Sequence, residues 1–251
     1  MLKRRIVPCL DVRDGRVVKG IRFAGLRDAG DPAELAAAYA QQGADEIVLL
    51  DVAATPEGRQ TAHETVRAVR ERIDVPLTVG GGVRSVSDAE ALLEAGADKV
   101  AINTAAVVRP ELLTEIARQF GTQCTVIAID ARRNGGDWYV TVESGQKERS
   151  FSAVEWAKLA VSKGAGEILL TSWDRDGTGA GYDLELLAAV RQIASVPLIA
   201  SGGAENPQHL MQALDVGVDA VLVASMLHSG AYVVSDLKRK LKEQGVEVRV
   251  C

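Results

Sequence analysis

VPLIASGG, at residues 196–203, is a short apolar run that ends in two glycines. Residues 75–82, VPLTVGGG, nearly repeat it 121 residues earlier, a spacing close to half of the 251-residue chain. Each run predicts a buried β-strand. Glycines directly after a strand leave backbone N–H groups that can face an anion. The two runs therefore predict a duplicated fold with two anion-binding loops.

The repeat extends along the chain. Residues 43–50 resemble 164–171, and residues 96–100 resemble 217–221, at the same spacing of 121. Short apolar runs, typical of parallel strands buried on both faces, alternate with amphipathic stretches typical of helices. The expected strands are 5–11, 46–51, 76–80, 99–103, 125–130, 167–171, 197–201 and 220–224. The expected helices lie near 33–42, 60–72, 85–95, 110–120, 152–163, 183–194, 206–216 and 233–244.

Eight strand–helix units in series predict the α/β class and a single (β/α)8 TIM barrel over residues 1–251. The internal twofold repeat predicts two half-barrels, about 1–122 and 123–251. A doubly wound parallel sheet is the alternative, and the repeat argues against it.

Composition excludes several classes of function. The net charge is −5, aromatic residues make up 4%, and no basic patch with interleaved aromatics occurs, which disfavours nucleic-acid binding. No apolar run reaches 18 residues, so no membrane span is expected. The three cysteines and three histidines lack the spacings of zinc sites or disulfide frameworks, so we expect no metal and a reducing cytoplasm. Cys9 and Cys124 are expected to pack inside strands of the core.

Two segments exceed the usual length of connections. Residues 132–150 alternate apolar and polar side chains between glycines, which predicts a hairpin inserted after the fifth strand. Residues 12–31 are expected to form a long functional loop, which carries Arg13, Lys19, Arg22 and Arg27.

Two aspartates end opposite strands of the expected barrel. Asp11 ends the first strand and Asp130 the fifth. Active sites of this architecture lie at the carboxyl ends of the strands, and a pair of carboxyls there suits general acid–base catalysis. The alternative for each aspartate is a loop cap, but a symmetry-related pair favours catalysis. Asp51 and Asp176 are expected to bind substrate hydroxyls instead.

Four loops predict the phosphate sites. Gly80–Gly82 and Asn103-Thr104 follow the third and fourth strands, and Gly202-Gly203 and Ala224-Ser225 follow the seventh and eighth. Each pair offers backbone N–H groups and a hydroxyl at neighbouring loops. Tight turns alone would explain one glycine loop, but not the paired partner loops. Two phosphate sites across one mouth predict a substrate with a phosphate at each end.

Four charged residues lie at strand starts, at the opposite end of the barrel. Arg5, Glu46, Lys99 and Glu167 could close a ring of ion pairs there, and simple solvent exposure is the alternative for each. Glu46 and Glu167 are related by the repeat, whereas the position equivalent to Lys99 is Ala220. The repeat therefore does not explain why Arg5 and Lys99 stand at these positions.

Several motifs together resemble the family of cyclase subunits of imidazole glycerol phosphate synthase. They are CLDVRDGRVVKG (9–20), LRDAGDP (26–32), TVGGG (78–82), DKVAINTA (98–105) and DRDGT (174–178). The similarity runs from about residue 3 to residue 250. Departures from the family pattern occur at residues 142–147, where a His-Gly-Gly stretch is frequent, at Trp173, and at residues 51–54.

The resemblance implies an enzyme of histidine biosynthesis that needs no cofactor. Its substrate would be a phosphoribulosyl-formimino aminoimidazole carboxamide ribonucleotide, which ammonia converts to imidazole glycerol phosphate and aminoimidazole carboxamide ribonucleotide. The resemblance assigns acid–base roles to Asp11 and Asp130 and substrate contact to Lys19. It also implies a glutaminase subunit on the bottom face, from which ammonia passes through the barrel by way of the ring of Arg5, Glu46, Lys99 and Glu167.

The complete set expected to bind substrate and its phosphates is Lys19, Asp51, Gly81, Gly82, Asn103, Thr104, Thr171, Asp176, Gly177, Ser201, Gly202, Gly203, Ala224 and Ser225. Two alternatives stay open at this point. One is the sister barrel, the phosphoribosyl-formimino isomerase that makes this substrate, and the other is a barrel that serves only as an interaction scaffold.

Overall fold

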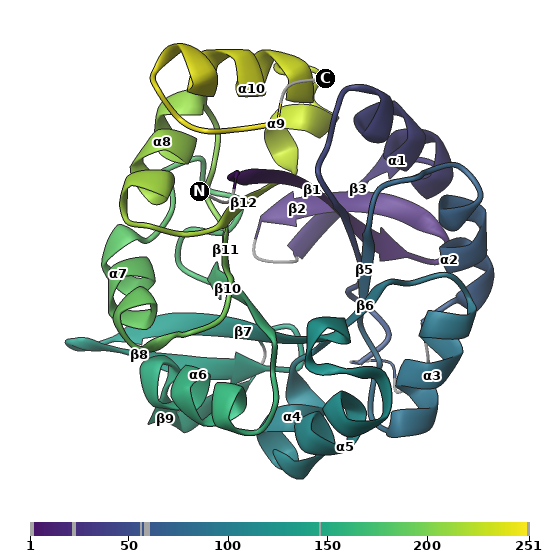
Figure 1. The fold of residues 1–251 in the computed structure, drawn as a ribbon, viewed down its shortest axis with the longest axis vertical. Helices are drawn as coiled ribbons and strands as arrows, with labels where there is room; N and C mark the ends of the chain where they lie inside the picture. Colours follow the sequence, from purple (N-terminus) through teal and green to yellow (C-terminus); the bar gives the residue numbers. More distant parts are fainter. Residues whose placement is uncertain (1–2, 22–23, 56, 58–60, 146, 250–251) are drawn as a thin grey trace.

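The computed structural model describes residues 3–21, 24–55, 57, 61–145 and 147–249. Eight parallel strands form a closed barrel inside a ring of helices (Figure 1). In order around the barrel they are β1 (Arg5–Arg13), β4 (Ile47–Asp51), β5 (Leu77–Gly80), β6 (Lys99–Ile102), β7 (Thr125–Asn134), β10 (Glu167–Ser172), β11 (Leu198–Ser201) and β12 (Ala220–Val223). The pairing of β12 with β1 closes the barrel. The predicted TIM barrel is therefore confirmed.

A helix follows each barrel strand and covers its outer face. The eight are α1 (Pro32–Gln41), α2 (His63–Arg70), α3 (Val86–Glu94), α5 (Glu111–Phe120), α6 (Ala153–Ser162), α7 (Leu184–Ile193), α8 (Pro207–Asp215) and α10 (Val234–Glu243). Hydrogen bonds from the backbone to an N-cap side chain explain where several of these helices begin. Asp31 accepts from the backbone of Ala33 and Glu34, and Ser85 accepts from Asp88 N. Two short helices were not expected, α4 (Thr104–Val108) and α9 (Ser225–His228).

The described residues of the segment 12–31, which are 12–21 and 24–31, form antiparallel strands in place of the expected loop. β2 (Arg16–Ile21) pairs with β1 and with β3 (Ala24–Gly30). Asp14 and Gly15 make the turn between β1 and β2 with φ of 51° and 73°, and Asp-Gly is a strong signal for such a two-residue turn. The loop prediction was wrong because the Asp-Gly turn lets the chain fold back on β1 and continue as further strands. Arg22, which was predicted to lie in the loop, is outside the described residues.

The second inserted hairpin was predicted correctly. β8 (Asp137–Val142) pairs antiparallel with β7, and β9 (Lys147–Ser152) pairs with β8. Cys9 is buried within β1, as expected. Cys124, however, lies in the short 3-10 helix η1 (Thr122–Cys124) and is partly exposed, so its placement inside a strand was wrong.

One guanidinium clamp occurs twice, at the predicted spacing of 121 residues. Arg70 donates to Asp98 at 2.9 Å and to the carbonyl of Val75 at 3.0 Å. The equivalent contacts run from Arg191 to Asp219 at 2.8 Å and to the carbonyl of Val196 at 3.1 Å. Each aspartate also accepts from the backbone of a barrel strand, at Leu77 and Leu198. These contacts agree with the internal repeat, which stays a prediction.

A buried ion pair ties the last helix to the first strands. Lys238 of α10 donates to Asp45 at 2.8 Å, and both side chains are almost completely buried. The other oxygen of Asp45 accepts from the backbone of Ile6 in β1 at 2.8 Å. The pair therefore fastens α10 across the seam at which the barrel closes.

We expect Lys238→Ala to lower the free energy of unfolding by about 3–5 kcal/mol, because it leaves the Asp45 carboxylate buried without its cation. The neighbouring Arg239 forms an exposed pair with Asp236, so Arg239→Ala should change stability by less than about 0.5 kcal/mol. Urea unfolding of both variants gives the comparison. Equal losses in the two variants would show that the buried pair is not what fastens the helix.

Candidate active site

A cavity of about 600 Å³ opens at the carboxyl ends of the barrel strands. Asp11, Asp130 and all fourteen residues predicted to bind substrate line it. The structure thus brings together side chains from every barrel strand or the segment that follows it. The reason is geometric, since parallel strands in a closed barrel end at one mouth.

Asp11 faces an ammonium group. It lies on β1, is 8% exposed, and has one oxygen 3.5 Å from Lys19 Nζ on the β2 strand of the first hairpin. Burial lowers the pKa of Lys19, but the carboxylates of Asp11 and Asp176 outweigh burial and raise that pKa overall. The Lys19 side chain is therefore a cation at neutral pH.

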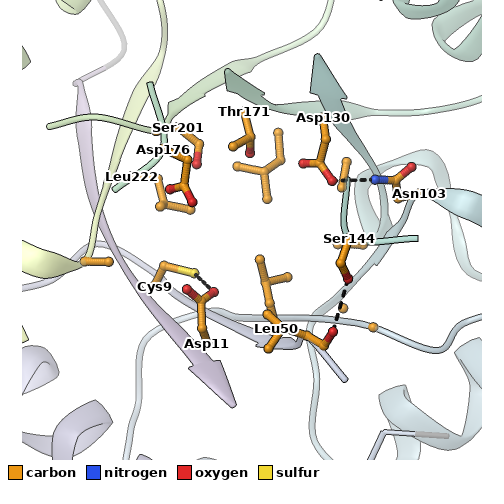
Figure 2. A pocket seen from close by; sticks show the side chains of 18 of the residues that line it. Cys9, Asp11, Leu50, Asn103, Asp130, Ser144, Thr171, Asp176, Ser201 and Leu222 are labelled. Atoms are coloured by element: carbon orange, nitrogen blue, oxygen red, sulfur yellow. Dashed lines mark hydrogen bonds between the residues drawn. The ribbon is translucent and has the colours of Figure 1, made fainter. Parts of the chain in front are cut away.

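Cys9 lies beneath Asp11, two residues earlier on the same strand. Its thiol donates to the second oxygen of Asp11 at 3.5 Å (Figure 2). Burial, with the nearby Asp11 carboxylate, raises the pKa of this thiol well above its ordinary value, so it remains a neutral donor. Cys9 belongs to the barrel core, as the sequence predicts, but it also borders the cavity, which the sequence analysis missed.

Asp130 faces Asp11 from the other side of the cavity and has neutral partners (Figure 2). It accepts from Asn103 Nδ2 at 2.9 Å. Burial raises the pKa of Asp130 to about 7, with a further contribution from the Asp176 carboxylate, against hydrogen bonds from Thr171 and Asn103. This carboxyl is therefore divided between its acid and base forms near neutral pH.

The two glycine loops that are predicted to bind anions share one geometry. Gly81 and Gly82 have φ of 101° and 69°, and Gly202 and Gly203 have φ of 93° and 95°, all in the region that favours glycine. A side chain at Gly81 would collide with the backbone of Asp51. The partner loops enter α4 and α9, and each begins with a hydroxyl residue, Thr104 or Ser225, as the sequence predicts.

The rims of the two glycine loops differ in charge. Arg84 and Arg109 line the cavity beside the first pair of loops, whereas Glu205, the repeat equivalent of Arg84, lies beside the second. The sequence analysis missed these three residues because the glycine pattern does not distinguish them. Asn103 Oδ1 is a further feature, since it is buried and has no hydrogen-bond partner among the described residues.

The four charged residues at the bottom of the barrel form a closed ring. Arg5 donates to Glu46 at 2.8 Å and to Glu167 at 2.5 Å. Lys99 donates to the same two carboxylates at 2.9 Å and 2.7 Å. The glutamate side chains are buried, while 24% of the Arg5 side chain and 18% of the Lys99 side chain are exposed. Two positive and two negative groups thus balance at the bottom opening.

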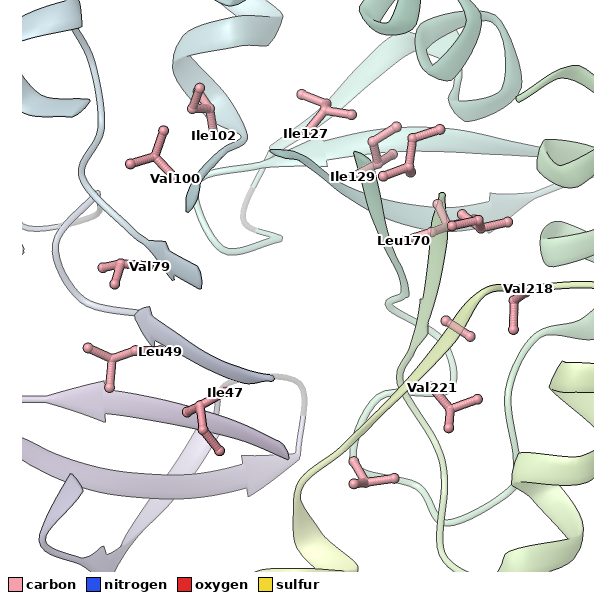
Figure 3. Close-up of a cluster of buried hydrophobic side chains, with 14 of the residues drawn as sticks. Ile47, Leu49, Val79, Val100, Ile102, Ile127, Ile129, Leu170, Val218 and Val221 are labelled. Carbon is pink, nitrogen blue, oxygen red and sulfur yellow. The ribbon is translucent and has the colours of Figure 1, made fainter. Parts of the chain in front are cut away.

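Apolar side chains separate this ring from the cavity. The inner cluster consists of Val7, Cys9, Val48, Ala101, Val126, Leu169, Ile199, Ala220 and Leu222. Residues that alternate with them, such as Leu49 and Val100, point away from the barrel axis into the layer under the helices (Figure 3). The barrel interior between its two polar ends is therefore lined by small or medium-sized apolar groups.

The described residues contain no group of three or more His, Cys, Asp or Glu side chains that could hold a metal ion. Within the same part of the chain, none of the helices combines the length and apolar character that a membrane span requires.

Comparison with known proteins adds the family. Residues 5–233 match the family model described as "Histidine biosynthesis protein". A protein of Exiguobacterium sibiricum named "Imidazole glycerol phosphate synthase subunit HisF" is 52% identical over 249 residues, which is 99% of this chain and 100% of that protein. A protein of the same name from Streptococcus mutans is 50% identical over 251 residues, again 99% of this chain and 100% of the relative.

The raised pKa of Asp130 predicts a pH dependence of stability. The folded carboxyl titrates at about 7, compared with an ordinary value of 3.8, so between these pH values the unfolded chain has lost a proton that the folded chain keeps. The contribution of Asp130 to stability therefore falls as pH rises from about 4 to about 7. Asp130→Asn removes this loss. The unfolding midpoint of the variant minus that of the wild type should therefore increase as pH rises from about 4 to about 7, and should stay constant at higher pH. Asp14→Asn, at an exposed turn, is the matched control. A constant difference between Asp130→Asn and the wild type would contradict the raised pKa.

Proposed function

Because this chain belongs to the histidine biosynthesis protein family, we propose that it has the activity of the imidazole glycerol phosphate synthase HisF subunits to which it is about half identical over its full length. The reaction is the ammonia-dependent conversion of the phosphoribulosyl-formimino ribonucleotide to imidazole glycerol phosphate and aminoimidazole carboxamide ribonucleotide, carried out in the cytoplasm. It is a lyase reaction coupled to ring closure.

One observation carries the proposal. A single cavity holds two carboxyl groups on opposite strands, between two anion loops of the same geometry. β1 and β7 are four strands apart in a barrel of eight, so Asp11 and Asp130 lie across the mouth from each other. A substrate with a phosphate at each end would place its central atoms between the two carboxyls.

The two carboxyl groups suit the proton transfers of this reaction. Ammonia addition, cleavage of a C–N bond and closure of the imidazole ring each move protons at the reacting centre. Asp130, whose pKa is about 7, can both donate and accept a proton near neutral pH. Asp11 is held by Lys19 and Cys9, which orient it toward the same space. We propose that the pair exchanges protons with the substrate from its two faces.

We further propose that a glutaminase subunit docks at the bottom of the barrel and that the ring of Arg5, Glu46, Lys99 and Glu167 gates the entry of ammonia. Two features support this. The ring spans the bottom opening with a balanced set of ion pairs. The apolar interior above it would admit neutral ammonia far more readily than a charged ammonium ion.

Asp11→Asn and Asp130→Asn should each lower kcat with ammonium salt by about 10²- to 10⁴-fold, the usual contribution of a general acid or base. Asp14→Asn, which changes an exposed aspartate on the turn next to β1, should keep the wild-type rate. The assay supplies the ribulosyl substrate with ammonium salt at alkaline pH and follows the loss of its absorbance.

The same assay separates the alternatives. If the protein consumes the ribosyl aldose and leaves the ribulosyl substrate unchanged, it is the isomerase instead. If both Asp→Asn variants keep the wild-type rate, the acid–base assignment fails. If the wild type turns over neither substrate, the interaction-scaffold alternative gains support.

Lys99→Ala should uncouple the two nitrogen sources. It removes a cation that contacts both buried glutamates, so glutamine-dependent turnover with the glutaminase subunit should fall by about tenfold, equivalent to about 1.4 kcal/mol. Turnover with ammonium salt should remain within a factor of about 3 of wild type, because the carboxyl pair is untouched. Lys99→Arg, which keeps the charge, should restore part of the coupling. Equal effects on both nitrogen sources would reduce the ring to a structural role.

A further inference from the structure

The tip of the β8–β9 hairpin, residues 143–145, forms part of the cavity wall. Ser144 lines the cavity, and its hydroxyl donates to the carbonyl of Val52 at 3.1 Å (Figure 2). The backbone N–H of Glu143 donates to Thr104 Oγ1 at 3.0 Å. The tip therefore joins the loop after β4 to the start of α4, beside the first anion loop.

The backbone of this tip is held in an unfavourable conformation. Glu143 and Ser144 both have a φ of 54°, and Gly145 has a φ of 78°. Residues with a Cβ rarely adopt this left-handed region, and two in succession need support from their surroundings. The turn at Asp14 and Gly15 has glycine at its second position, whereas the Glu143–Ser144 turn has a Cβ at both positions.

Two side chains behind the tip supply that support. The indole of Trp173 packs on Gly145 so closely that any side chain at 145 would collide with it. Arg132 donates to the carbonyl of Gly145 at 3.3 Å, and its guanidinium carbon lies 5.2 Å from the centre of the Trp173 ring. The backbone N–H of Trp173 in turn donates to Ala131 of β7 at 2.8 Å. Neither Trp173 nor Arg132 is among the residues that line the cavity.

We propose that Trp173 is a positioning residue for the substrate, acting through Arg132 and Gly145 on the hairpin tip. With the tip in place, the N–H of Glu143 occupies an acceptor position of the Thr104 hydroxyl, so the hydroxyl hydrogen is directed to a bound anion. The proposal rests on the proposed function, because Thr104 is expected to hold one phosphate of its substrate. Loss of the indole would release the tip and weaken binding while the carboxyl pair stays in place.

Substitutions at Trp173 and Arg132 test the proposal, with Arg133 as the matched control. Arg133 is the next residue on β7 and lies over the ring of Trp138 at 5.1 Å, a nearly identical cation–π contact that does not involve the tip. Trp173→Leu and Arg132→Leu should raise KM by about tenfold, with kcat within a factor of about 3 of wild type. Trp173→Phe keeps an aromatic face and should restore most of the affinity, and Arg133→Leu should leave KM within a factor of about 2.

Hydrogen exchange at the Glu143 amide gives a readout that does not depend on activity. Exchange should accelerate in Trp173→Leu and Arg132→Leu, and should match the wild type in Trp173→Phe and Arg133→Leu. Unchanged KM and unchanged exchange in Trp173→Leu would overturn the proposal. So would a parallel loss of kcat and unfolding midpoint in Trp173→Leu, since that would mark a purely structural role. If the wild type has no cyclase activity, the proposed function fails, and the exchange experiment still decides whether Trp173 holds the tip.

Discussion

Closure of eight parallel strands by backbone hydrogen bonds is the constraint on which the rest of this structure depends. Because helices cover the outside and side chains fill the inside, each barrel strand is buried on both faces along its middle. Charged side chains of the barrel strands can then be accommodated only at the two ends of the barrel. The cavity with its carboxyls lies at one end, and the ring of ion pairs lies at the other. Whether a residue of a barrel strand can be charged therefore depends on whether it lies in the middle of the strand or at one of its ends.

Charged groups are paired differently at the two ends of the barrel. At the bottom, two cations and two buried carboxylates are in direct contact, which compensates each charge within the protein. At the mouth, Lys19 contacts Asp11, while Asp130 has an amide and a hydroxyl in place of a cation. Burial without a direct counter-charge is what raises the pKa of Asp130 to about 7. The charges at the bottom are thus balanced within the protein, whereas the mouth holds one carboxyl whose pKa is about 7.

The apparent symmetry of the halves is broken at the rim of the cavity and at the two inserted hairpins. The glycine loops and the arginine clamps recur at a spacing of 121 residues. Arg84 and Glu205, 121 residues apart, give the two glycine loops opposite rim charges. The two hairpins also differ, since one carries Lys19 to Asp11 while the other presses Ser144 against the cavity wall. Differences of this kind make the two ends of the cavity unlike in charge and shape.

The sequence by itself determined the strand–helix order, the two aspartates, the glycine loops and the four charges of the ring. These features follow from local rules, because burial periodicity and glycine positions depend on near neighbours. The first hairpin could also be predicted from the sequence, because Asp14-Gly15 is a strong signal for a two-residue turn. Only the tertiary structure decided the raised pKa of Asp130 and the contact of Trp173 with Gly145. Each depends on residues that are distant in sequence or on how deeply a group is buried, which no local pattern encodes.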